Sequence, residues 1–364
     1  MAGSLEVNVV TYNVLSGKLA TPEHYVETDS RYLSSESRLQ RLKRRLFQRA
    51  VKSKAVVCLQ EVSQAWQGAL ETFFCANEYT FVFSGYGNSR NGYMGVGVAF
   101  PNAKFTLEDA NVVRLADTGG RWPSRARRPP PTLGRRLWNT LSNIPFGVGD
   151  WLLGRYAPEN VLDVEYEIGR RRNAAVSVAL TTEANAEFTV TTYHCPCMFG
   201  TPEKREVQLV HTAMLLQHAK KWAGSRPFIV AGDFNTQPDS ACYRMMALGE
   251  NPATSPDMPV PLAKERAWIL ADLPKMRSAY REHKAAEPMF TTNVVTRFDP
   301  EGFKGTLDYI LLSPDISVRG TELIPEDSML LPNEAEPSDH YLLGATLLLG
   351  EEADSSDTEA VLVS

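Results

Sequence analysis

Short runs of apolar, mostly β-branched residues recur along the chain and predict the strands of a sheet core. Residues 7–12 form the first run, which ends at the polar Asn13, as expected for a buried strand that reaches the surface at its end. Further runs have the length and composition of buried strands: 55–59, 95–100, 174–180, 188–193, 228–231, 307–312 and 341–349.

Helical spacing of apolar residues separates these runs. Leu39, Leu42 and Leu46 recur at helical intervals, and residues 203–222 form the clearest long helix. In that helix we expect four apolar side chains to face the core: Val207, Val210, Met214 and Trp222. Strands that alternate with helices predict an α/β or α+β fold.

One basic segment interrupts this alternation. Residues 117–140 contain six arginines, Arg121 and Arg125 among them, opposed by Asp117 alone, which gives a formal charge of +5. Three consecutive prolines and two tryptophans accompany the arginines. This composition predicts a long loop inserted into the body at about 117–160. It could grip an RNA backbone through phosphate contacts, and a solvated loop is an equal alternative.

Polar residues that suit a hard cation sit at the ends of several predicted strands. Asn13 and Glu61 each close a strand, and Asp233 and Asn235 follow a third; the others are Asp308, Asp339 and His340. Oxygen donors of this kind favour Mg²⁺ or Mn²⁺ over zinc. Singly, each has an ordinary explanation, because a glutamate at a strand end is usually solvated and Asp-Phe-Asn also fits a turn or helix cap. Their joint order along the chain is therefore the informative feature.

That order resembles the endonuclease/exonuclease/phosphatase superfamily, which includes DNase I and exonuclease III. The matching motifs span residues 11–340: Thr11-Tyr12-Asn13, Leu59-Gln60-Glu61-Val62, Tyr193-His194, Gly232-Asp233-Phe234-Asn235, Leu307-Asp308-Tyr309 and Ser338-Asp339-His340. The resemblance implies a four-layer sandwich of two central β-sheets flanked by helices. It also implies a single catalytic domain over residues 1–350, with the metal site at one edge of the sheets.

Within the superfamily, the chain is most similar to the deadenylase-like branch of carbon-catabolite-repression deadenylases, nocturnin, angel-like proteins and 2′,5′-phosphodiesterases. Arg38 ahead of a helix, residues 290–292 before the Gly305–Asp308 motif, and residues 330–332 before the closing Ser-Asp-His carry this likeness. Cys195-Pro196-Cys197 after the motif histidine departs from the pattern of many deadenylases. No leucine-rich repeat precedes the body, so docking into a deadenylase complex through such repeats is not expected.

The resemblance implies roles for the motif residues. Glu61 would be the principal Mg²⁺ ligand, with Asn13 beside it, and Asp339 would bind a second metal or bridge to the first. Asp233 would orient or deprotonate the attacking water. The remaining motif residues would act on the substrate phosphate: Asn235 by holding the water or a phosphate oxygen, His340 by contacting the scissile phosphate with Asp308 fixing its tautomer, and His194 by donating to a phosphate oxygen.

Two further residues are candidates for substrate binding. Phe290 lies in a segment that resembles the family's base-stacking phenylalanine segment, and an ordinary core phenylalanine is an equal alternative. Asn173 follows three arginines just before a strand, where the family often has a polar residue near the substrate, and a cap or turn fits it equally well. Cys195 and Cys197 beside His194 are expected to be small buried thiols rather than a metal site.

Charge and composition limit the functional class. The net charge of the 364 residues is −5, with 43% hydrophobic and 22% charged residues, values typical of a folded soluble protein. Residues 351–364, expected to be a disordered acidic tail, carry five acidic residues and no basic one, which leaves the body neutral. Five cysteines do not suggest a disulfide framework. We therefore expect a cytoplasmic or nuclear protein that is not secreted, has no membrane segment and is a monomer.

These observations favour a Mg²⁺-dependent phosphodiesterase, a hydrolase acting on ester bonds, that cleaves single-stranded RNA as a 3′-to-5′ exoribonuclease of deadenylase type. The alternatives on the same scaffold are a small-molecule phosphoesterase acting on a nucleotide, inositol phosphate or sphingolipid head group, and a DNA-repair endonuclease. A non-enzymatic RNA-binding relative would be expected to have lost a metal ligand, and each expected ligand is present in the sequence.

Overall fold

Two six-stranded sheets form the centre of the computed structural model, which describes residues 5–120, 122, 163–252, 271–325 and 329–350. The first sheet has the strand order β13-β14-β1-β2-β4-β3. Its strands are, in that order, Ile316–Thr321, Leu343–Leu349, Leu5–Asn13, Val56–Val62, Gly95–Pro101 and Tyr79–Gly85. The sheet is mixed, because β1 runs parallel to β2 and antiparallel to β14.

The second sheet has the order β5-β6-β7-β8-β12-β9. Its strands are Phe105–Arg114, Ala174–Thr182, Glu187–His194, Phe228–Asp233, Asp308–Leu312 and Arg277–Ser278. It is also mixed, with β7 parallel to β8 and β12 antiparallel to β8.

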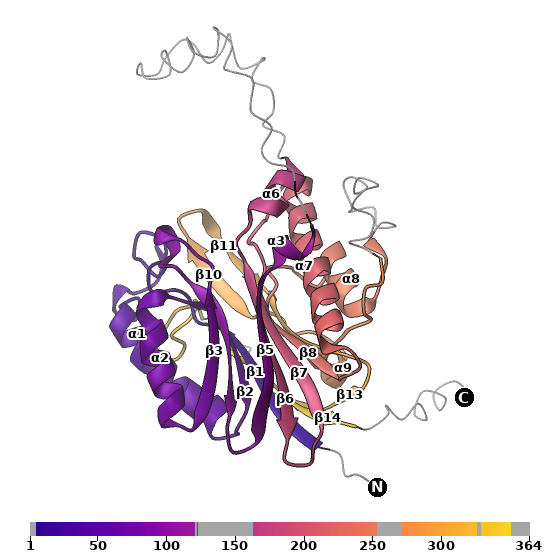
Figure 1. Cartoon of the computed structure of the whole chain (residues 1–364). Coiled ribbons are helices and arrows are strands. Elements are labelled where there is room, and N and C mark those ends of the chain that lie inside the picture. Colours follow the sequence, from indigo (N-terminus) through magenta and orange to yellow (C-terminus); the bar gives the residue numbers. More distant parts are fainter. Residues whose placement is uncertain (1–4, 121, 123–162, 253–270, 326–328, 351–364) are drawn as a thin grey trace, which may run out of the picture.

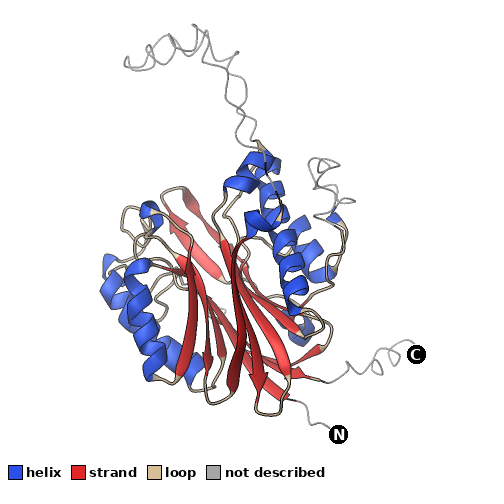
Figure 2. Ribbon diagram, viewed as in Figure 1, coloured by secondary structure: helices blue, strands red, loops and turns tan. Residues whose placement is uncertain are grey.

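Side-chain alternation packs the two sheets face to face. In β1, Val7 and Val9 enter the core between the sheets, whereas Val10 and Tyr12 face the helices outside. Helices α1 (Ser35–Leu46) and α2 (Gln64–Ala76) cover the first sheet. Four helices lie on the outer side of the second: α3 (Leu115–Thr118), α6 (Val164–Arg170), α7 (Pro202–Ala223) and α8 (Ala241–Leu248). The structure therefore confirms the predicted four-layer sandwich (Figures 1 and 2).

One end of the sandwich carries most of the long connections. A two-stranded hairpin, β10 (Thr292–Thr296) with β11 (Asp299–Gly305), projects at this end, together with α6 (Figure 1). The strand β1 begins at the opposite end and reaches this one at Asn13. A short helix, α9 (Ala279–Lys284), packs against β12 and β13.

Most sequence predictions of elements are confirmed, with a few corrections. The predicted strands and the long helix appear, but Trp222 in α7 is only half-buried and lies under the guanidinium of Arg226 instead of in the core. Asp117, predicted to lie in the inserted loop, belongs to α3 and pairs with Arg114 at 2.7 Å. The rest of the predicted insert, including Arg121 and Arg125, and the acidic tail lie outside the described residues.

Two other sequence expectations concern thiols and membranes. All five cysteines are free, and Cys195 is buried as expected, whereas Cys197 is exposed, which corrects its prediction as a buried thiol. Within the described parts of the chain, no helix has both the length and the apolar character that a membrane span needs.

Candidate active site

Strand register in the second sheet brings three polar residues side by side. His194 ends β7 and aligns with Asp233 at the end of the parallel strand β8. Asp308 begins β12 and aligns with Asp233 from the other side. Because these positions are neighbours across three hydrogen-bonded strands, the sheet itself sets their spacing.

The first sheet supplies the opposite wall. Asn13, at the end of β1, donates from Nδ2 to Asp233 Oδ2 (2.9 Å) and to Glu61 Oε1 (3.2 Å). A second bridge between the sheets runs just below, from Gln60 Nε2 to Thr192 Oγ1 (2.9 Å). The amide nitrogen of Asn13 thus links a carboxylate from each sheet.

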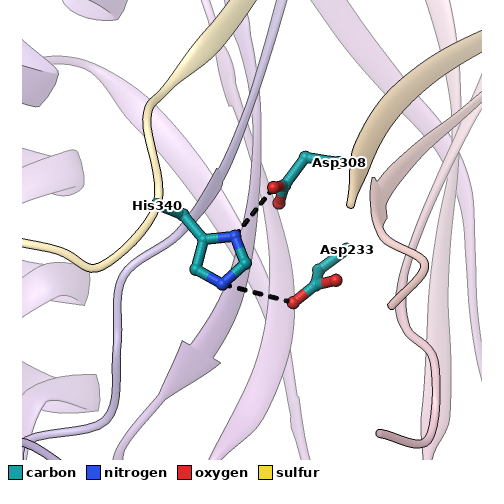
Figure 3. A group of neighbouring side chains, drawn as sticks. All are labelled: Asp233, Asp308 and His340. Carbon is teal, nitrogen blue, oxygen red and sulfur yellow. Dashed lines mark hydrogen bonds and ion pairs between the residues drawn. The ribbon is translucent and has the colours of Figure 1, made fainter. Parts of the chain in front are cut away.

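A buried carboxylate–imidazole pair lies beside Asp233. The Nδ1 atom of His340 is 2.7 Å from Asp308 Oδ2, and its Nε2 is 3.8 Å from Asp233 Oδ2 (Figure 3). Burial lowers the pKa of His340, but attraction from Asp308 and the nearby aspartates outweighs it and raises the pKa well above its usual value. Burial raises the pKa of Asp308, an effect that His340 partly offsets. This arrangement favours a protonated ring facing the pocket.

Thr291 supports the Asp308–His340 pair, and sequence reasoning did not identify this role. Its hydroxyl donates to Asp308 Oδ2 (2.6 Å) and accepts from the backbone N–H of Leu307 (3.0 Å). A backbone hydrogen bond from Tyr341 N to Thr291 O (2.7 Å) fixes the residue after His340 to the same segment. Thr291 therefore positions both members of the pair.

Two site residues have left-handed backbone conformations. The φ angle is +59° at Glu61 and +51° at Asn235, a region that side chains other than glycine enter at a cost. The turn at Asn235 is closed by its N–H, which donates to Asp233 Oδ1 (2.8 Å). Such conformations concentrate at functional sites, where the surrounding contacts maintain them.

His194 hydrogen-bonds to Tyr86 and Asn235, and its Nε2 also lies 3.5 Å from Asp233 Oδ2. Its Nδ1 lies 2.8 Å from the hydroxyl of Tyr86, and its Nε2 lies 3.1 Å from Asn235 Nδ2. Asn173 donates to the backbone oxygen of His194 (2.8 Å), and its side chain lines the pocket. Tyr86 has no motif in the sequence that would have identified it.

Glu61 and Asp339 present carboxylate oxygens to the pocket. Glu61 Oε2 accepts from the backbone N–H of Ser16 (3.0 Å), and Asp339 Oδ2 accepts from the hydroxyl of Tyr25 (2.6 Å). Within the described ranges, neither carboxylate forms an ion pair with a lysine or arginine. Uncompensated carboxylates of this kind fit a hard divalent cation.

Among the described residues, one group of possible ligand atoms is compact. Donor atoms of Asp233, Asp308 and His340 lie within 4.8 Å of one another. However, His340 Nδ1 already hydrogen-bonds to Asp308, so that nitrogen is not available to a metal while the pair is intact. Glu61 and Asp339 are therefore the carboxylates that we expect to bind a cation.

One pocket of about 910 Å³ lies at the centre of this arrangement. Glu61, His194, Asp233, Asn235 and His340 line it, and Asp308 lies behind them as a fully buried residue. The expected catalytic and metal-binding residues thus come together at one end of the sandwich.

Phe290 is buried in the core, which was one of its two expected environments. Its side chain is 1% exposed and packs with Leu331 and Tyr341 in a separate hydrophobic cluster. Lys304 Nζ lies 4.1 Å from the centre of its ring. In this conformation the ring offers no open face to a base, so the placement fits the alternative of a core phenylalanine.

Comparison with known proteins identifies the family. Residues 10–340 match the Endonuclease/Exonuclease/phosphatase family. The chain belongs to this family. The match covers every superfamily motif on which the sequence resemblance rests and all six strands of the second sheet.

Among proteins of similar sequence are fungal exoribonuclease subunits. The chain is 24% identical to the CCR4-Not complex 3′-5′-exoribonuclease subunit Ccr4 of Aspergillus niger, an alignment that covers 93% of this chain and 51% of that protein. The chain thus spans about half the length of the fungal relatives it matches.

Solved structures share the fold. ANGEL2, described as a 2′,3′-cyclic phosphatase, superposes with a TM-score of 0.68 at 20% identity, covering 96% of this chain and 97% of that one. The catalytic domain of human Nocturnin gives a TM-score of 0.57 at 17% identity and covers 95% and 96%. These likenesses agree with the resemblance to the deadenylase-like branch, and the solved structures share the fold.

Proposed function

We propose that the protein is a Mg²⁺-dependent phosphodiesterase that acts on single-stranded RNA as a 3′-to-5′ exoribonuclease of deadenylase type. The observation that carries the proposal is the Asp308–His340 pair beside Asp233, in one pocket with the carboxylates of Glu61 and Asp339. The likeness to the Ccr4 exoribonuclease subunit supports RNA as the substrate.

The residues around the pocket divide the work of hydrolysis. Glu61, with Asn13 beside it, would hold the cation, and Asp339 would bind a second one or bridge to the first. When bound, Mg²⁺ (or Mn²⁺) neutralises phosphate oxygens and stabilises the leaving oxygen. Asp233, fixed by Asn13 and by the N–H of Asn235, would accept the proton of the attacking water.

The histidines act on the phosphate. His340, kept protonated by Asp308, would contact the phosphate where negative charge accumulates as the bond to the leaving oxygen breaks. His194 would donate a further hydrogen bond to a phosphate oxygen, and Asn235, 3.1 Å from its ring, would hold the water or a second oxygen. Each of these groups stabilises charge that is largest in the transition state.

A substrate panel tests the proposal. We would incubate the protein in Mg²⁺ with labelled poly(A), mixed-sequence RNA, RNA ending in a 2′,3′-cyclic phosphate, single-stranded DNA and abasic duplex. A ladder from the 3′ end of poly(A) is the expected result. Cleavage confined to abasic sites, or removal of the cyclic phosphate alone, would reject the exoribonuclease.

Replacing the principal carboxylate tests the chemistry. Glu61→Gln keeps the size of the side chain but removes the charge that would hold the cation, so RNA hydrolysis should fall by at least about a thousandfold. The melting temperature should remain close to that of the unchanged protein. Glu71→Gln, an exposed substitution on α2, is the matched control and should hydrolyse RNA normally. Undiminished turnover by the Glu61 variant would contradict the assignment.

A further inference from the structure

A second hollow adjoins the active-site pocket and is walled by arginines. It has a volume of about 760 Å³ and shares Tyr86, Gly87, Arg170 and Arg172 with the pocket. Because Tyr86 contacts His194, the two hollows meet on the His194 side of the site. Together they form one groove, which we call the arginine groove.

Side-chain hydrogen bonds fix one wall of the groove. The guanidinium of Arg114 donates to the backbone oxygens of Gly169 and Arg171 and pairs with Asp117 at 2.7 Å. Arg171 in turn donates to Glu167 Oε2 (2.9 Å). Through these contacts Arg114 and Arg171 act as structural residues, and they hold the segment that carries Arg170 and Arg172.

Arg90 is presented from the facing loop by a closed turn. The side chain of Asn91 accepts from Asn88 N (2.7 Å), and that of Asn88 accepts from Arg90 N (2.9 Å), so the one-turn helix Ser89–Asn91 is capped in both directions. The exposed Arg90 therefore sits on an ordered support at the edge of the pocket.

Two of the arginines have unused guanidinium groups. Among the described residues, the side chains of Arg90 and Arg172 make no hydrogen bond or ion pair, and both are exposed. Arg170 forms an ion pair with Glu167 (Nε to Oε2, 2.7 Å), but its side chain remains half exposed. The part of the groove beyond the pocket has no acidic residue in its described lining. A concentration of uncompensated positive charge is thus directed into a cavity.

Charge is distributed unequally along the groove. The carboxylates of Glu61, Asp233 and Asp339 line the pocket and not the second hollow, whereas Arg170 and Arg172 line both hollows and Arg90 lines the pocket. An arginine guanidinium matches a phosphate in shape and charge. The carboxylates therefore suit a cation and the phosphate that is cut, and the arginines suit phosphates that are not cut.

We propose that the arginine groove binds backbone phosphates of a single-stranded polynucleotide adjacent to the scissile phosphate, through Arg90 and Arg172. The site then selects a chain over a mononucleotide or other small phosphoester, because only a chain places a second phosphate in the groove. This inference rests on the proposed phosphodiesterase function and names the feature of the substrate that the site requires.

Binding measurements test the groove separately from catalysis. All proteins would carry Asp233→Asn to prevent cleavage, and fluorescence anisotropy with Mg²⁺ would follow a labelled mixed-sequence oligoribonucleotide and a dinucleotide. In Arg90→Ala/Arg172→Ala, affinity for the oligonucleotide should fall by about tenfold to a hundredfold, as expected for two lost charge-assisted contacts. The slope of log affinity against log salt should decrease by about 1.4, and dinucleotide binding should barely change.

A matched variant controls for net charge. Arg49→Ala/Arg319→Ala removes the same two charges from exposed arginines that pair with Glu322 and Glu6 away from the pocket, and it should bind RNA normally. The inference would be overturned if the groove variant bound the oligonucleotide as tightly as the parent protein. It would also be overturned if the groove variant lost as much affinity for the dinucleotide as for the oligonucleotide, or if the control variant lost as much affinity for the oligonucleotide as the groove variant. Duplex DNA that binds with the same dependence on the two arginines would overturn the single-strand assignment.

Cleavage by the otherwise unchanged protein separates the two proposals. If the protein with Asp233 intact cuts the oligonucleotide, but oligonucleotide binding does not depend on Arg90 and Arg172, the phosphodiesterase function stands and the proposed role of the groove is wrong. If binding depends on the two arginines but no phosphodiester bond is cut, the groove stands and the proposed function is wrong.

Discussion

The two histidines of the pocket are held by different kinds of partner. His340 hydrogen-bonds to the buried carboxylate of Asp308, whereas His194 contacts the hydroxyl of Tyr86 and the amide of Asn235. A hydrogen-bonded carboxylate favours the charged form of the His340 imidazole. We infer that His340 contributes charge and that the contact with Tyr86 fixes the ring of His194 in place.

Removing the hydroxyl of Tyr86 tests this division. Tyr86→Phe takes away the contact to His194 Nδ1, so the ring loses one of its two fixed points, and kcat on RNA should fall by roughly tenfold. KM should change less, because Tyr86 does not supply the charge that holds a phosphate. Steady-state kinetics with a thermal melt would measure both effects.

A second tyrosine provides the comparison. The hydroxyl of Tyr79 donates to the backbone oxygen of Ala50 (3.3 Å), outside the pocket lining. Tyr79→Phe should lose similar stability, about 1 kcal/mol, and retain full turnover. Equal loss of activity in the two variants would mean that the Tyr86 effect is only structural.

Sequence reasoning at the residue scale succeeded where a residue belongs to a motif. Asp233, Asp308 and His340 end or flank strands whose apolar pattern is clear, and the register of the sheet then brings them together. Tyr86 and Thr291 reach the site through loops, whose path depends on contacts between distant segments. Phe290 shows that nearness to a motif does not by itself identify a substrate-binding residue, because an apolar residue near a motif can as easily belong to the core.

At the scale of elements, one buried arginine joins the connections on which the site is built. From α1, Arg38 donates to the backbone oxygens of Val14 (2.7 Å), Leu15 (2.6 Å) and Pro337 (2.6 Å). It thereby ties the segment after Asn13 to the segment before Asp339. Its guanidinium also lies 5.0 Å from the ring centre of Trp66 on α2.

Replacing Arg38 should therefore damage both stability and the site. Arg38→Met fills similar space but leaves buried backbone oxygens without donors, and we expect the free energy of unfolding to fall by roughly 2–4 kcal/mol. RNA hydrolysis should fall as well, because the segments that carry Asn13 and Asp339 lose their common anchor. Urea unfolding and activity at low temperature would separate the two losses.

Arg44 on the same helix is the control. It is exposed, so Arg44→Met should change stability by no more than about 0.5 kcal/mol and leave activity intact. A loss for Arg38→Met as small as that for Arg44→Met would show that the segments are held by other contacts.

Elements were predictable to the extent that their burial leaves an apolar pattern in the sequence. The strands β2 and β8 are almost completely buried and begin with continuous apolar runs, and most of β1 is buried as well. In contrast, β5 is an edge strand with exposed Glu108 and Asp109, and β9 has only two residues. Neither carries enough buried surface to leave a pattern in the sequence.

At the scale of the whole molecule, a neutral histidine couples stability to pH. His211 on α7 is fully buried between the hydroxyl of Tyr193 (2.9 Å) and the backbone oxygen of Ile168 (3.2 Å). Burial is the main cause that lowers its pKa from 6.5 to about 3. The folded protein therefore resists a proton that the unfolded chain accepts below pH 6.5.

Stability should accordingly decrease as the pH falls. The contribution of the neutral ring is complete above pH 6.5 and is lost progressively toward pH 3. Between pH 7 and pH 5 the free energy of unfolding should fall by about 2 kcal/mol on this account. Urea titrations of the protein and of His211→Gln would show the effect as a difference in pH dependence. If the two proteins had parallel pH profiles, His211 would not be its source.

The hydrogen bonds that cross between the sheets give the pocket one further property. Asn13 and Glu61 belong to the first sheet, Asp233 to the second, and Asn13 and Gln60 each bond to the opposite one. Neither half of the sandwich therefore contains a working centre by itself. During refolding, turnover should return only when the sheets have docked, after secondary structure has formed. The recovery of enzymatic turnover would then report the rate of the last folding step, the docking of the two sheets.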